Sequence, residues 1–195
     1  SMAGMLPFSW KVSNWKQFNE EFFPMLEEEF GKNNLKALYF NPVRIELYTS
    51  FEVDPNNPSF KGKKLRSFGG ASTVIIEALG GDPVSLPSSE LAMAVRTKVV
   101  DGFGTSLQSW YGLGLMEAAP HAYLTDGLLV MGPGWVINKT AWNSYPKEVQ
   151  DLFLQVSREA RDWGFDYAND LDQKILKLAS SKPKEVYPHT LTEAQ

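Results

Sequence analysis

The first hydrophobic pattern along the chain is helical. Between positions 13 and 31, aromatic and aliphatic residues recur every three or four positions, and acidic residues fall mostly between them. This spacing predicts an amphipathic helix over 13–31 that ends at Gly31. Two short apolar runs follow at 35–40 and 43–48, and an Asn-Pro dipeptide between them predicts two extended segments joined by a turn.

From Lys63 onward, short apolar runs alternate with helical patterns. Glycine pairs separate several of these runs, as turns between elements require. We expect strands at 64–68, 83–86 and 99–103, and helices at 72–79, 88–95 and 105–111. Strands that alternate with helices form parallel βαβ units with right-handed crossovers, so this part of the chain predicts an α/β sheet.

The last third of the chain is dominated by one long helical pattern. After extended runs at 128–131 and 135–138, an apolar stripe continues from about Pro146 to Ser180. A helix of that length is roughly 50 Å long, which exceeds the width of one small domain. We therefore expect it to lie across two lobes. The final segment, 190–195, begins like a capped helix and contains only one turn.

Composition narrows the class of protein. The 195 residues are 43% hydrophobic, carry a net charge of −4 and include no cysteine. The negative net charge argues against a nucleic-acid partner, because proteins that bind nucleic acid normally carry a basic surface. No run approaches the roughly 20 apolar residues of a membrane helix. Without cysteine there is neither a disulfide nor a thiolate ligand. The Ser-Met start is typical of a residue left by tag removal.

Candidate catalytic groups are sparse. The two histidines, His121 and His189, lack the spacing of metal ligands, and we interpret them as ordinary loop residues. The acidic run 27–29 points in successive directions around a helix, so its carboxylates do not converge. The Gly-x-Gly pairs at 102–104 and 112–114 lack the full dinucleotide motif. The sequence predicts no catalytic residue, no cofactor and no metal site.

Arg66 is the most promising binding residue. It lies in an apolar strand, just before Gly69 and Gly70 and a predicted helix start. Ligands bind at the carboxyl ends of strands in α/β sheets, and an arginine there can hold a carboxylate with two hydrogen bonds. Two more predicted strand ends lead into small polar residues, at 88–89 and 104–106, and could complete one polar rim.

Five segments in order along the chain resemble one known family. The similarity is to the solute receptors of tripartite ATP-independent periplasmic (TRAP) transporters, the family of the C4-dicarboxylate receptor. The matching segments are 60–66 (FKGKKLR), 78–84 (ALGGDPV), 89–95 (SELAMAV), 98–102 (KVVDG) and 136–150, which includes VINK, Trp142 and PKEVQ.

The resemblance implies a type II periplasmic-binding-protein fold. Two α/β lobes would be joined by hinge strands and spanned by the long helix. We expect lobe 1 at 1–43 and 129–170, and lobe 2 at 44–128 and 171–195. The chain is shorter than family receptors, which implies truncation at both ends, an incomplete lobe 1 and a C-terminal end of lobe 2 that is also incomplete.

The resemblance also implies a periplasmic receptor, not an enzyme, that passes a small organic acid to TRAP membrane subunits. Arg66 would clamp the carboxylate. The remaining candidate binding residues are Phe68, Gly69, Ser88, Ser89, Phe103, Thr105, Ser106 and Trp110. Phe68 and Phe103 suit the core equally well, and Trp110 fits packing against a neighbouring helix better than a ligand contact.

Two other functions stay open at this point. One is a hydrolase of acidic sugars, which needs two convergent carboxylates that the sequence does not offer. The other is an interaction module that assembles through the apolar helix 13–31. Because truncation would remove one wall of the cleft, we expect the chain alone to bind ligand weakly or not at all. An exposed half-core would also favour a homo-oligomer.

Overall fold

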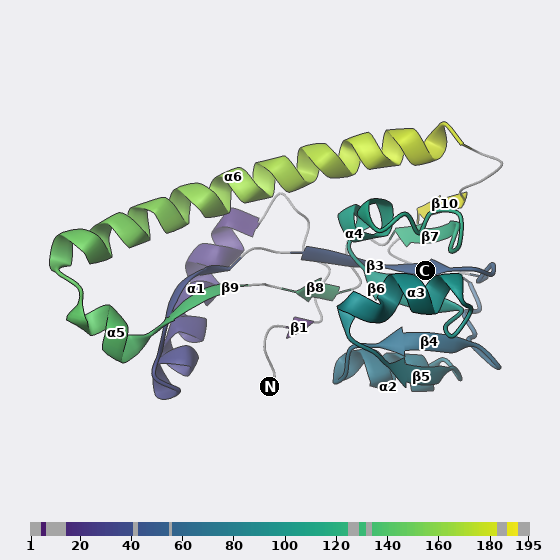
Figure 1. The fold of residues 1–195 in the computed structure, drawn as a ribbon, viewed down its shortest axis with the longest axis horizontal. Coiled ribbons are helices and arrows are strands. Elements are labelled where there is room, and N and C mark those ends of the chain that lie inside the picture. Colours follow the sequence, from purple (N-terminus) through teal and green to yellow (C-terminus); the bar gives the residue numbers. More distant parts are fainter. Residues whose placement is uncertain are drawn as a thin grey trace.

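The computed structural model describes residues 5–6, 15–40, 43–54, 56–124, 129–131, 134–182 and 187–190. Its longest element, α6 (Lys147–Ser180), runs along one side of the molecule, from α5 (Lys139–Ser144) to β10 (Tyr187–Thr190) (Figure 1). With 34 residues it is about 50 Å long. The helix predicted over 146–180 is confirmed.

Most strands belong to one mixed sheet. Its order is β1 (Met5–Leu6), β8 (Leu129–Met131), β3 (Val43–Thr49), β6 (Gly102–Thr105), β4 (Lys64–Ser67) and β5 (Asp82–Ser85). One further strand, β7 (His121–Leu124), pairs with β3 and with β10. Strand β3 is the centre of the sheet, because its first half pairs with β8 and its second half with β6 and β7.

The predicted parallel βαβ arrangement is present around β4. This strand pairs in parallel with β5 and with β6. The connections contain α2 (Ala71–Ala78), the 3₁₀ turn η2 (Ser88–Glu90) and α3 (Leu91–Arg96), and α4 (Leu107–Gly112) follows β6. Strand β6 lies later than the predicted 99–103, because the amides of Val99 and Val100 donate to the carbonyl of Ala94 and close α3.

A second, smaller sheet lies at the other end of the molecule. It consists of β2 (Leu35–Phe40) and the antiparallel β9 (Gly134–Asn138), and it lies beside α1 (Trp15–Lys32) (Figure 1). The predicted helix and strands are confirmed here. Helix α1 ends at Lys32 rather than Gly31, because Asn34, with φ 58°, takes the left-handed conformation of the turn.

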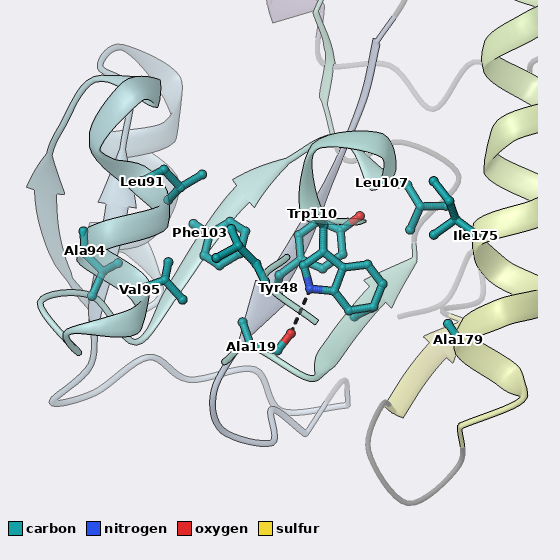
Figure 2. Close-up of a cluster of buried hydrophobic side chains, with 13 residues drawn as sticks. Tyr48, Leu91, Ala94, Val95, Phe103, Leu107, Trp110, Ala119, Ile175 and Ala179 are labelled. Atoms are coloured by element: carbon teal, nitrogen blue, oxygen red, sulfur yellow. Dashed lines mark hydrogen bonds between the residues drawn. The ribbon is translucent and has the colours of Figure 1, made fainter. Parts of the chain in front are cut away.

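The main core lies between the large sheet, α3, α4 and the C-terminal part of α6. Tyr48 stacks between Phe103 and Trp110, with ring centroids 5.6 and 4.8 Å apart (Figure 2). The Trp110 indole N–H donates to the carbonyl of Ala119 at 3.0 Å. Ile175 of α6 belongs to the same cluster. Burial of these rings is the main favourable contribution to folding here.

The two halves of α6 have different surroundings. Near its C-terminus, Ile175 and Ala179 are buried in the core. Nearer its N-terminus, part of the predicted apolar stripe is exposed, including Leu152 at 58% and Trp163 at 67%. Among the described residues, no helix is both long enough and apolar enough to cross a membrane.

Two further predictions, for the two histidines and for the last segment, can be compared with the structure. Strands β7 and β10 did not emerge from the sequence pattern. His121 and His189, interpreted as loop residues, lie on these two parallel strands, with Nδ1 and Nε2 3.3 Å apart. The interpretation was wrong, because strands of only four residues are too short to show a recognisable pattern in the sequence. Of the predicted last helical turn, Thr190 belongs to β10, and 191–195 lie outside the described residues.

Candidate functional site

A cavity of about 490 Å³ opens at the carboxyl ends of β4 and β6, within the size range of small-molecule sites. One wall comes from the large sheet and the turns that follow its strands. The opposite wall comes from α1, β2 and β9. The lining residues are Phe30, Phe40, Val43, Ile45, Arg66, Phe68, Ser88, Gly104, Thr105, Ser106, Ser109, Gly134 and Val136.

Arg66 supplies the charge of this cavity. It occupies the third position of β4 and is only 7% exposed. Its Nε donates to the carbonyl oxygen of Leu86 at 3.1 Å, and its Nη2 donates to Ser88 Oγ at 3.0 Å. A guanidinium has five N–H donors, so three remain after these two bonds.

Arg66 has no acidic partner in the described part of the chain. The ion pairs there involve other residues. Burial lowers the pKa of Arg66, although an arginine stays protonated at neutral pH. A buried cation without a counter-charge is costly for folding. Such a group is well suited to bind an anion that enters the cavity.

The turn after β4 fixes the position of Phe68. Ser72 Oγ accepts from the Phe68 amide at 3.2 Å and donates to the Gly69 carbonyl at 2.8 Å. Gly69 and Gly70 have φ of 90° and 55°, a conformation that favours glycine. The Phe68 ring therefore lies 5.1 Å from the Arg66 guanidinium carbon, a cation–π contact that holds the arginine in the cavity.

Ser88 has a different role from the one its position predicts. It was expected to cap a helix over 88–95, but the chain forms η2 there, without a side-chain cap. The Ser88 hydroxyl instead accepts from Arg66. The start of η2 is thus coupled to the orientation of the guanidinium.

A group of small polar residues lines the cavity where β6 leads into α4. The Ser106 hydroxyl caps α4, since it accepts from the Ser109 amide at 3.2 Å. It also donates to Ser109 Oγ at 3.0 Å. The Thr105 hydroxyl has no hydrogen-bond partner among the described residues. This leaves it free to meet a ligand.

The opposite wall is apolar. Phe40 of β2 faces Gly134 of β9 in the strand register. A Cβ atom at Gly134 would overlap the Phe40 ring, so only glycine fits there without displacing the ring. Phe30 of α1 packs against Phe40, with the two rings tilted and their centroids 5.5 Å apart. Helix α1 therefore contributes to this wall both directly and by supporting Phe40.

Strand β3 separates the cavity from α6. Val43 and Ile45 line the cavity, whereas Arg44 between them pairs with Asp172 of α6 at 2.9 Å. Asp172 Oδ1 also accepts from the side-chain amide Nε2 of Gln108 at 2.6 Å. Burial raises the pKa of Asp172, and Arg44 opposes that shift. Arg44 thus anchors the helix and contributes no charge to the cavity.

The predicted binding residues fall into two groups. Arg66, Phe68, Ser88, Thr105 and Ser106 lie together in the cavity lining. The others lie outside it: Gly69 is in the β4–α2 turn, Ser89 is in η2, and Phe103 and Trp110 are fully buried in the core.

Several lining residues were not identified from the sequence. They come from elements far apart along the chain, and their spacing shows no local signal; these residues are Phe30, Phe40, Val43, Ile45, Ser109, Gly134 and Val136. Only the alternation of Val43, Arg44 and Ile45 could have indicated that β3 has two different faces.

The cavity lacks the groups that hydrolysis of a sugar requires. None of its described lining residues is a carboxylate, whereas glycosidases use two that flank the scissile bond. In the described part of the chain, three or more His, Asp or Glu side chains nowhere form a metal-binding group. The observed chemistry is one cation, several hydroxyls and an apolar wall.

Comparison with known families gives one matching family model. The model of the family described as bacterial extracellular solute-binding protein, family 7 (DctP), matches residues 6–195. An uncharacterized protein of Haemophilus influenzae is 26% identical over 96% of the chain, and a solute-binding protein of Albidiferax ferrireducens is 29% identical over 73%. The chain spans 58% and 43% of these two relatives.

Solved structures show the same fold. A TRAP periplasmic solute-binding protein from Sulfitobacter sp. NAS-14.1, with bound β-D-galacturonate, superposes with a TM-score of 0.85 at 19% identity. One from Sulfurospirillum deleyianum, with bound succinate, gives 0.82 at 23%. The alignments cover 97% and 99% of this chain and 64% of each neighbour. The predicted two-lobe α/β fold is therefore confirmed; the predicted lobe boundaries stay a prediction.

Proposed function

The chain belongs to family 7 of the bacterial extracellular solute-binding proteins, and we propose that it is a periplasmic TRAP-transport receptor for a small organic acid. Arg66 would hold the carboxylate through its remaining N–H donors. Thr105 would add a hydroxyl contact. The bound acid would then pass to the membrane subunits of the transporter. This role requires no bond to be broken, so the proposal is a binding protein and not an enzyme.

The observation that carries the proposal is the isolated charge of Arg66. A buried arginine that serves only the fold is normally paired with a carboxylate. Within the described part of the chain, Arg66 is hydrogen-bonded to neutral groups only, and it faces a cavity large enough for a metabolite. A ligand carboxylate would provide the missing negative charge and accept two parallel hydrogen bonds.

The geometry of the cavity also bears on the expectation of a missing wall. The sequence predicted that one side of the cleft would be absent. In the structure, Phe40 and Val136 face the cavity from β2 and β9, opposite the wall that carries Arg66. We therefore propose that the chain binds its ligand without another chain. That its affinity is weak stays a prediction.

A binding experiment tests the proposal. Ligand-observed NMR titrations with succinate, D-galacturonate, L-pyroglutamate and orotate detect dissociation constants up to the millimolar range. We expect at least one acid to bind and Arg66→Met to weaken its binding at least roughly tenfold. Arg66→Lys, which retains the charge without the planar donor pair, should lie between the two.

The control for this experiment is Arg96→Met. Arg96 is an exposed arginine at the end of α3 that bonds the carbonyl of Leu113 at 2.8 Å, away from the cavity lining. Its replacement should leave binding unchanged. If no carboxylate binds to the unmodified chain, or if Arg66→Met and Arg96→Met have equal effects, the proposed role of Arg66 is wrong.

The alternative of an interaction module rests on a different surface. The predicted assembly would use the apolar helix 13–31, which corresponds to α1, where Met25 is 63% exposed. That function would not depend on Arg66. Homo-oligomer formation stays a prediction.

A further inference from the structure

The cavity divides into a polar side and an apolar side. Arg66 and the hydroxyls line one side. The other side carries three phenylalanine rings and three aliphatic side chains: Phe30, Phe40, Phe68, Val43, Ile45 and Val136. A ligand bound by Arg66 must place the rest of its body against these groups. Apolar surface of the ligand would be removed from water there, which favours binding.

Only one carboxylate finds a cation in this cavity. Arg66 is the one charged residue of its described lining. Two other basic groups, on the cavity strands β3 and β2, are outside the lining and paired, Arg44 with Asp172 and Lys36 with Glu27. A second ligand carboxylate would have to lose its hydration against an apolar wall, without an opposite charge.

The hydroxyls also limit what the ligand can carry. Ser106 and Ser109 are bonded to each other, and Ser88 accepts from Arg66. Among the described hydroxyls of the lining, only that of Thr105 is free of a protein partner. Ser88 and Ser109 accept in these bonds and each keep an O–H donor, so the described lining offers a ligand three hydroxyl contacts. An acid with many hydroxyl groups makes more hydrogen bonds than this to water, and the difference costs affinity.

Resting on the proposed function, we infer that the ligand is a monocarboxylate attached to a flat, largely apolar ring. Its carboxylate binds Arg66. Its ring lies beside Phe68, 5.1 Å from the guanidinium carbon, and reaches towards the phenylalanines of α1 and β2. Gly104 lets two of these apolar side chains keep their positions, since a Cβ atom there would lie 3.1 Å from Ile45 and 3.6 Å from Phe68.

The test compares four probes with the full 195-residue chain: phenylacetate, succinate, D-glucuronate and phenylacetamide. NMR titrations at neutral pH and constant ionic strength give each dissociation constant. We expect phenylacetate to bind at least roughly tenfold more tightly than succinate or glucuronate. The neutral phenylacetamide, which lacks the charge but keeps the ring, should bind at least as weakly as these two acids.

Two matched variants test the ring contact. Phe68→Leu should weaken phenylacetate binding by a larger factor than acetate binding, because acetate loses only the support that the Phe68 ring gives Arg66, whereas phenylacetate also loses its own ring contact. Phe153→Leu on α6, outside the cavity lining, should change neither. If succinate or glucuronate binds as tightly as phenylacetate and loses affinity in Arg66→Met, the ring preference is wrong and the receptor function stands. If no acid binds at all, both proposals fail.

Discussion

Replacing Arg66 by methionine should leave the fold nearly as stable as before. The variant loses hydrogen bonds to Leu86 and Ser88, each worth about 1.5–3 kcal/mol because the donor is charged. It also removes a cation that is only 7% exposed and has no described acidic partner, which recovers several kcal/mol of desolvation cost. The Met side chain can still pack against Phe68. The two effects offset each other to within about 2 kcal/mol.

Thermal unfolding measures this balance. For a chain of this size, 1 kcal/mol corresponds to about 2–4 °C in Tm. We therefore expect Arg66→Met to shift Tm by no more than about 8 °C in the absence of ligand, in either direction. It should also abolish the rise in Tm that a bound carboxylate causes in the unmodified chain. A fall of about 15 °C without ligand would refute the reasoning, because Arg66 would then be a structural residue whose replacement breaks the fold.

Three other replacements probe neighbouring features. Asp172→Asn should lower the free energy of unfolding by about 3 kcal/mol, because it removes the carboxylate that pairs with Arg44. Urea unfolding measures this loss, and an unchanged midpoint would contradict it. Gly134→Ala should lower the free energy of unfolding by about 1–3 kcal/mol and weaken ligand binding, because the added methyl group displaces Phe40. A variant with unaltered Tm and affinity would disprove the steric argument. Burial and the adjacent His189 lower the pKa of His121 below its usual 6.5, so the unfolded chain protonates this imidazole more readily than the folded chain does. The free energy of unfolding therefore falls on acidification from about pH 7 to about pH 5. His121→Gln should flatten that pH profile, and an equal slope in both proteins would argue against this reasoning.

The regular elements were largely predictable from the sequence because their signals are local. The stripe of α6 and the glycine turns after β4 depend only on neighbouring residues. Strands β7 and β10 were not predictable, because four-residue strands become strands through pairing with distant partners. The bounds of β6 also differed from the predicted 99–103, because hydrogen bonds at the end of α3 determine where that strand begins.

The candidate site shows the same division. Arg66 was identifiable, because a charged residue in an apolar strand before two glycines is unusual. Its bond to Ser88 was not, since a serine before a helical pattern normally caps the helix. The apolar wall was missed altogether. Phe40 and Gly134 are neighbours only because β2 and β9 pair, and nothing in either segment alone indicates that contact.

In strand β3, the number of residues that precede Val43 matters as much for the cavity as the types of residue in the strand. Val43 and Ile45 line the cavity, while Arg44 between them faces α6. Insertion or deletion of one residue before Val43 would reverse these faces along the strand. The Arg44 cation would then enter the binding cavity, and α6 would lose its ion pair in the same step. Evolution can therefore adjust specificity here by substitution, but a change in length would damage recognition and the long helix together.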